Sequence, residues 1–227
     1  MLRYPRTLAI GISQSGAAPD VSEVIETMRG LGHQTLAITN TPGSRLAQAA
    51  DLGIPLEMGV ETSVAATKTF TASMLALYEV VRAFAPAMPL LVPFDKGWVR
   101  QASGVIVRSS PTFTLARGYA FSAAHETALK LMECALIPTK AYSRADFEHG
   151  PKALAGPGSA AVAFDGGAEG IAAQGCSVIV PPEPPVPAEV APLYHVVFGQ
   201  WLALSAARAR GLDPDVPPHL NKVTETR

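Results

Sequence analysis

Three charged residues stand at spacings that place them on one face of an expected helix. Glu126, Lys130 and Glu133 occupy positions i, i+4 and i+7 of the segment 119–135. A lysine beside a carboxylate keeps the carboxylate ionised and can stabilise a developing enolate oxygen, while the carboxylate moves a proton. A solvent-facing stripe of salt bridges is the plainer interpretation, and the spacing alone favours it.

A histidine in a constrained loop is a second candidate for proton transfer. His149 lies within Glu148-His149-Gly150-Pro151, and an imidazole can act as acid or base near neutral pH. The alternative is a histidine that only caps a turn. The other histidines have no such context and are interpreted as structural; they are His33, His125, His195 and His219.

The sequence Ser13-Gln14-Ser15-Gly16 joins an expected strand to an expected helix and could hold a phosphate. Backbone N–H groups at a helix N-terminus attract anions, two hydroxyls and an amide add donors, and Gly16 permits close approach. The loop matches neither the Walker pattern nor GxGxxG, which favours a small phosphate ester over a nucleotide. A serine that simply caps the helix is the alternative.

Strands and helices alternate along the sequence, which predicts an α/β fold with parallel sheets flanked by helices. The expected strands are 7–12, 34–39, 53–56, 112–116, 138–142, 159–164 and 177–180; the expected helices are 20–31, 45–50, 64–85, 119–135 and 193–210, with a helical turn in 147–154. Residues 86–111 carry four prolines and read as an irregular link.

The composition limits the classes of partner. Hydrophobic residues make up 48% of the chain, charged residues 16%, and the net charge is −1, which favours a globular protein and disfavours nucleic acid or membrane surfaces as partners. Cys134 and Cys176 lie far apart without CxxC spacing, so we expect no disulfide framework, metal or cofactor, and a cytoplasmic location. No apolar run reaches the roughly 18 residues of a membrane span.

Several motifs, taken in order, resemble those of the sugar isomerase (SIS) domain. The first half carries SQSG, ITNTPGSRLAQAAD and AATK at Ala65–Lys68; the second carries ARGYAFSAAHETALKLMECALIPTKAYSRADFEHGP and ends in ARGLDPDVPPHLNKVTETR. The second half is similar to the isomerase half of glucosamine-6-phosphate synthase. The resemblance implies two SIS domains, each a doubly wound, three-layer α/β/α sheet, at 1–88 and 112–210, with a linker at 89–111 and a tail at 211–227 that closes over the sugar.

The resemblance also implies roles for individual residues. Ser13–Gly16 would bind the sugar phosphate, Glu133 would shuttle the proton beside Lys130, and His149 would open the sugar ring, from the other subunit of a homodimer. Lys222 would approach the carbonyl carbon, able to form an imine, although a solvated tail lysine is the alternative. Further neighbours of the substrate would be Val64, Ala66 and Asn221.

Two departures from the synthase pattern remove hydroxyl donors. Ala18 and Ala66 stand where synthases have threonine and serine, and a hydrogen bond to a charged group is worth about 1.5–3 kcal/mol. We therefore expect a phosphate site that differs from that of the synthases.

The loop Ser13–Asp20, with its Pro-Asp ending, and the VAATK motif are similar to stand-alone SIS-type glucosamine-6-phosphate deaminases, and no glutaminase domain is visible. The expected reaction converts glucosamine 6-phosphate to fructose 6-phosphate and ammonia, so the expected ligand is a phosphorylated hexosamine or ketohexose. Alternatives are an aminotransferase that uses free ammonia or a separate glutaminase, and a non-catalytic phosphosugar sensor. The sensor is disfavoured because no helix-turn-helix is visible.

Two spacings predict that segments of the full-length protein are missing. Only about ten residues separate the last two expected strands, whereas a parallel crossover needs a dozen or more. The first half has only three expected strands and no strand–helix unit before its phosphate loop.

Overall fold

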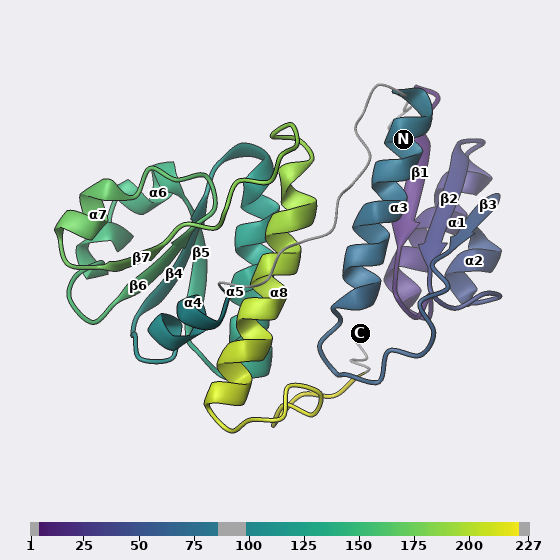
Figure 1. Cartoon of the computed structure of the whole chain (residues 1–227). Coiled ribbons are helices and arrows are strands. Elements are labelled where there is room, and N and C mark those ends of the chain that lie inside the picture. Colours follow the sequence, from purple (N-terminus) through teal and green to yellow (C-terminus); the bar gives the residue numbers. More distant parts are fainter. Residues whose placement is uncertain (1–4, 86–98, 223–227) are drawn as a thin grey trace. The chain divides into compact units, whose positions relative to one another are not determined.

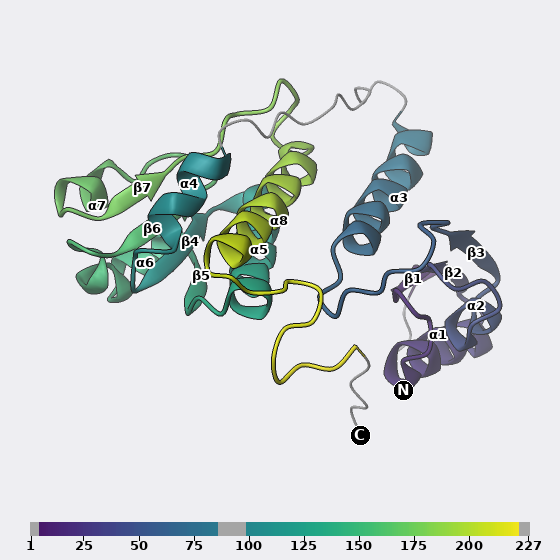
Figure 2. The same cartoon turned by 60° about the horizontal axis from the view of Figure 1, so that its bottom comes forward.

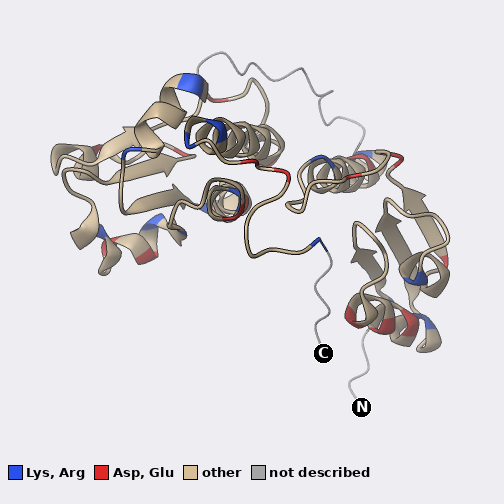
Figure 3. Ribbon diagram, turned by 90° about the horizontal axis from the view of Figure 1, so that it is seen from below, with Lys and Arg blue, Asp and Glu red and all other residues tan. Residues whose placement is uncertain are grey.

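The computed structural model describes residues 5–85 and 99–222 of the 227. These residues form two compact units, and each is described by itself. Unit 1 comprises residues 5–62 and 66–85, and unit 2 comprises residues 63–65 and 99–222. None of the helices in these ranges has the length and apolar run needed to cross a membrane. Positions of basic and acidic residues are interspersed along the ribbon (Figure 3).

Unit 1 is built on a three-stranded parallel sheet of order β1-β2-β3. Its elements are β1 (Leu8–Ile12), α1 (Pro19–Gly30), β2 (Gln34–Thr39), α2 (Arg45–Ala49), β3 (Leu52–Pro55) and α3 (Lys68–Phe84). Helices α1 and α2 bury Ile25 and Leu46 against Ala37 of β2. Helix α3 runs along the other face of the sheet (Figures 1 and 2), so the sheet is covered on both sides.

Helix α3 begins later than the alanine-rich sequence predicts, at Lys68 rather than Val64. The reason is the buried carboxylate of Glu61, which accepts hydrogen bonds from the N–H groups of Thr67 at 2.9 Å and Thr69 at 3.4 Å, and from the Thr69 hydroxyl. These N–H groups lack partners inside the helix, so a side chain that satisfies them fixes where the helix begins. Residues 62–67 consequently remain a loop.

Unit 2 is built on a four-stranded parallel sheet of order β5-β4-β6-β7. Its elements are α4 (Val99–Ile106), β4 (Thr112–Ala116), η1 (Gly118–Ala120), α5 (Phe121–Ala135), β5 (Thr139–Ser143), α6 (Arg144–Glu148), η2 (Pro151–Leu154), β6 (Ala160–Ala163), α7 (Glu169–Ala173), β7 (Ser177–Ile179) and α8 (Ala191–Ala209). Phe113 of β4 packs with Phe147 of α6 and Ile171 of α7 on one face. On the other face Thr114 donates a 2.8 Å hydrogen bond to the Ala124 carbonyl of α5, and α8 packs on α5.

Besides the start of α3, the structure differs from the sequence expectations at three places. The expected linker contains helix α4, which packs on α8, while the part of that linker before Val99 lies outside the described residues. The strand order reverses at β4 in unit 2, as in a doubly wound sheet, but the three described strands of unit 1 run in simple order.

The third difference concerns the crossover between the last two strands. Strand β6 ends at Ala163 and β7 begins at Ser177, and the short helix α7 lies between them. The connection therefore spans residues 164–176, which is long enough for a parallel crossover. The spacing therefore does not require a missing segment at this point, because the short helix α7 was not recognised in the sequence; that a segment is missing here stays a prediction. The same expectation for unit 1 stays a prediction.

Candidate functional site

The Ser13–Gly16 loop presents polar groups where β1 ends and before α1 begins. The hydroxyl oxygens of Ser13 and Ser15 accept hydrogen bonds from the N–H groups of Gly16 and Ala17, both at 3.2 Å. The N-cap of α1 is Ala18, which makes no side-chain hydrogen bond to the helix. The plain interpretation of a capping serine therefore does not hold; in the first turn of α1 the Val21 N–H donates instead to Asp20 Oδ1 at 2.8 Å. The side chains of the three polar loop residues remain partly exposed.

The loop is fixed to the next strand and the next helix. The Gln14 carbonyl accepts a hydrogen bond from the Asn40 N–H at 3.0 Å, and the Gly16 carbonyl accepts one from the Leu46 N–H at 2.9 Å. Gly16 has a φ of 61°, and a Cβ atom there would lie 2.1 Å from the hydroxyl oxygen of Ser44. Glycine is thus required both by backbone conformation and by the approach of the N-cap of α2.

We expect Gly16→Ala to lower the free energy of unfolding by about 2–4 kcal/mol, because it combines a left-handed backbone with an overpacked contact. Gly43→Ala is the matched control, since Gly43 has a φ of 74° and open space around its Cα. Urea unfolding of both variants separates the two costs. An equal loss in both would contradict the importance of the Ser44 contact.

The charged face of α5 is an ion-pair cluster with one accessible carboxylate. The Lys130 Nζ lies 2.6 Å from Glu133 Oε2 and 3.9 Å from Glu126 Oε1. Side-chain exposure is 5% for Lys130 and 4% for Glu126, but 25% for Glu133. A stripe facing solvent would expose all three side chains, so that plainer interpretation is wrong. The arrangement leaves one carboxylate open to a ligand with a buried ammonium group behind it.

Glu126 was not assigned a role from the sequence, although it stands four residues before Lys130. Burial raises the pKa of this carboxyl, and the Lys130 charge and a 3.3 Å hydrogen bond from the Gln200 amide act in the opposite direction. Glu126 thus helps to hold Lys130 in place from the buried side. The four-residue spacing between Glu126 and Lys130 indicated that the two side chains are neighbours. The burial of Glu126 against α8 could not be predicted from that spacing.

Cys134 follows Glu133 and is unsuited to act as a nucleophile. Burial is the main reason why the pKa of its thiol is raised, to about 11. The thiolate is the reactive form, so the side chain stays a protonated, inert neighbour at neutral pH. Among the described residues no cluster of three or more His, Cys, Asp or Glu side chains is arranged to hold a metal.

His149 occupies the C-cap of α6 and is exposed. Helix α6 covers the face of the sheet opposite to α5 (Figure 1), so the sheet separates this ring from the Lys130–Glu133 pair within the unit. The ring borders an open depression of about 650 Å³ that is also lined by Lys152 and Gln174. The structure therefore does not bring His149 to the α5 cluster within one chain.

Lys222 is not a freely solvated tail lysine. Its Nζ donates a 2.7 Å hydrogen bond to the Ser63 carbonyl, and the side chain is partly buried. Val64 lies in the same contact, since its N–H donates to the Asp215 carbonyl at 3.1 Å. Asn221 is exposed beside Lys222, and Ala66 is partly buried before α3.

Comparison with known proteins shows which family and which proteins the chain resembles. Residues 3–83 match the family model of the SIS domain. Glutamine–fructose-6-phosphate aminotransferases (isomerizing) from Aeropyrum pernix and Pyrobaculum aerophilum are 30% and 32% identical, each over 95% of this chain and 43% of the relative. The chain thus spans less than half the length of these curated relatives.

Two solved structures agree with this fold. Glucosamine-6-phosphate deaminase from Thermotoga maritima superposes with a TM-score of 0.79 at 25% identity, over 98% of this chain and 76% of the other. The C-terminal domain of glucosamine-fructose-6-phosphate aminotransferase from Francisella tularensis gives a TM-score of 0.72 at 24% identity, over 92% and 73%. The chain therefore has the parallel-sheet α/β fold of a SIS domain, with helices flanking the sheets.

Proposed function

We propose that this chain acts on a phosphorylated hexosamine and converts glucosamine 6-phosphate to fructose 6-phosphate and ammonia. The observation that carries the proposal is the contact between buried Lys130 and partly exposed Glu133. A carboxylate of this kind can take a proton from a carbon next to a carbonyl or imine group, and the ammonium group stabilises the charge that develops on oxygen. The names of the sugar-phosphate relatives support the same class of reaction.

The proposed reaction has three steps. The sugar ring opens, and Glu133 then takes the proton from C2 and returns it to C1. This transfer leaves a C2 imine, which water hydrolyses to the ketone with release of ammonia. In this proposal Ser13–Gly16 contacts the phosphate in unit 1, and Lys222 approaches the carbonyl carbon in unit 2. Neither role requires a metal or a cofactor.

The proposal includes a tandem arrangement of two SIS domains and a homodimer. Unit 2 has the reversed strand order of a doubly wound sheet, which supports a second SIS domain at 112–210 followed by a closing tail. The position of His149 on the face of the sheet opposite to α5 supports a role at the site of a second copy. Ring opening by the partner's histidine would make the dimer necessary for activity.

An aminotransferase-like reaction is the second candidate. The curated relatives named above carry that activity in their names, whereas the deaminase name comes from a superposed structure. The proline and aspartate that follow the phosphate loop favour the deaminase. Both reactions share the same proton transfer, so the direction is decided by the nitrogen source.

The test is an ammonia-release assay with glucosamine 6-phosphate, with fructose 6-phosphate plus ammonium chloride as the reverse assay. We expect ammonia release by the chain alone. Product formation from fructose 6-phosphate and glutamine, without ammonia release from glucosamine 6-phosphate, would favour the aminotransferase. Binding of either sugar phosphate without turnover in any assay would contradict an enzyme and indicate a phosphosugar sensor.

A further inference from the structure

Three hydrogen bonds join the segment Ser63–Ala65 to the tail that carries Lys222. Ser63 Oγ donates to Asp215 Oδ1 at 2.9 Å, the Val64 N–H donates to the Asp215 carbonyl at 3.1 Å, and Lys222 Nζ donates to the Ser63 carbonyl at 2.7 Å. Asp215 uses both its side chain and its backbone in this contact. All of these residues belong to unit 2.

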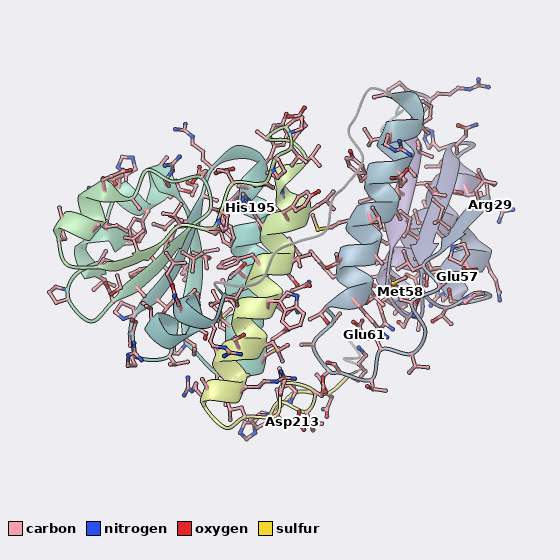
Figure 4. The ribbon with its side chains drawn as sticks, in the orientation of Figure 1. Arg29, Glu57, Met58, Glu61, His195 and Asp213 are labelled. Atoms are coloured by element: carbon pink, nitrogen blue, oxygen red, sulfur yellow. The ribbon has the colours of Figure 1, made fainter. Side chains whose placement is uncertain are left out.

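Within the described part of the tail, residues 210–222, no helix or strand follows α8, so these contacts fix where Lys222 lies. Asp215 is itself oriented by its neighbour in sequence, because its N–H donates to Asp213 Oδ1 at 3.0 Å; Figure 4 shows Asp213 on the loop that follows α8. Pro217 is buried and stiffens the stretch between Asp215 and Lys222. The tail is thus held at two points, and Ser63 takes part in both.

The contact also lies within electrostatic range of the α5 cluster. Asp215 is one of the charges that raise the pKa of the Cys134 thiol, together with Glu133 and Glu126. The aspartate is therefore close enough to act electrostatically on Cys134, which follows Glu133 in α5.

We propose that Asp215 is a positioning residue that fixes Ser63, and that the Ser63 carbonyl in turn holds the ammonium group of Lys222 for the reaction. This inference rests on the proposed function, in which Lys222 approaches the carbonyl carbon of the sugar. Asp215 is exposed and touches no substrate in this scheme. It acts by orienting the backbone carbonyl that receives the lysine.

The first measurement does not depend on catalysis. Brief acetylation of the folded protein with acetic anhydride, followed by peptide mass spectrometry, gives the reactivity of Lys222 relative to exposed Lys140. Asp215→Ala is expected to raise this ratio about fivefold, the size expected for loss of one hydrogen bond. Asp215→Asn keeps an oxygen acceptor and is expected to stay near the wild-type ratio. Glu183→Gln, which removes an exposed carboxylate elsewhere in unit 2, is the control for charge.

The second measurement is the steady-state rate of ammonia release. Asp215→Ala and Ser63→Ala are expected to lower kcat about fivefold with KM changed less than twofold, because the groups that bind the sugar are intact. Asp215→Asn should restore most of kcat, which a general loss of stability would not explain. Unchanged Lys222 reactivity in Asp215→Ala would overturn the inference, and so would raised reactivity with unchanged kcat. If the wild-type chain releases no ammonia, the proposed function fails, and the acetylation ratio still decides whether Asp215 holds Lys222.

Discussion

Glu133→Gln is expected to lower the kcat of ammonia release by about 10²- to 10⁴-fold, the range typical for loss of a general base. Glutamine keeps the size of the side chain and can accept a hydrogen bond from Lys130, but it cannot take a proton from carbon. The variant leaves the buried ammonium group of Lys130, which is 5% exposed, with the Glu126 carboxylate at 3.9 Å as its ionic partner. Some loss of stability is therefore expected beside the loss of kcat. KM should change little, since the carboxylate acts mainly in the transition state.

The measurement is steady-state kinetics with glucosamine 6-phosphate, with thermal unfolding of the same samples as a check of folding. Glu26→Gln makes the same chemical change on the exposed surface of α1 and should leave kcat unaltered. A sharper readout is exchange of substrate hydrogen with solvent deuterium, which should stop in Glu133→Gln and continue in the control. A variant with wild-type kcat would remove Glu133 as the proton shuttle.

The elements best predicted from sequence are those that local patterns determine. The apolar run 112–116 became β4 with the expected bounds, and 34–39 became β2, because short buried strands lie between clear turn signals. The start of α3 was wrong because it depends on Glu61, a residue that folds back onto the helix N-terminus. Helix α4 was missed because its buried face packs on α8, about ninety residues further along the chain.

In the candidate site too, the features that depend on local sequence were predicted, and those that depend on distant contacts were not. The contact between Lys130 and Glu133 follows from helical spacing alone and is present at 2.6 Å. The burial that distinguishes this pair from a surface stripe depends on α8, so the sequence favoured the wrong alternative until the family resemblance was added. The bond between Lys222 and Ser63 joins residues 159 positions apart, and no local pattern predicts a contact of that range.

Acid should destabilise unit 2 through one buried histidine. His195 on α8 (Figure 4) is 2% exposed and packs against Phe164, and neither ring nitrogen has a hydrogen-bond partner among residues 5–85 and 99–222. Burial lowers the pKa of this ring from an ordinary value of 6.5 to about 4. The folded state therefore disfavours the protonated ring, while the unfolded chain binds the proton freely. Above about pH 6.5 the ring is neutral in both states, so its protonation does not change the free energy of unfolding.

As the pH falls from 6.5 toward 4, the unfolded state gains the proton first, and the free energy of unfolding decreases. The expected loss is about 2 kcal/mol at pH 5 and about 3 kcal/mol near pH 4. His195→Gln and His195→Leu both remove this titration. Neither is expected to lose stability to acid as steeply as the wild type, and the leucine variant should also be as stable at pH 7.5 because it buries no unpaired polar group.

Urea unfolding at pH 7.5, 6 and 5 measures these differences, with unit 2 followed by the fluorescence of Trp201 on α8. His125→Gln is the control, since His125 is exposed on α5 and its loss should not alter the slope against pH. If the wild type and both His195 variants lose stability in parallel, the buried ring is not the acid-sensitive group. A result of that kind would indicate that carboxylates of unit 2 determine the sensitivity to acid. Glu126 would not be one of them, because burial raises the pKa of its carboxyl, so protonation at low pH stabilises the folded state at this residue.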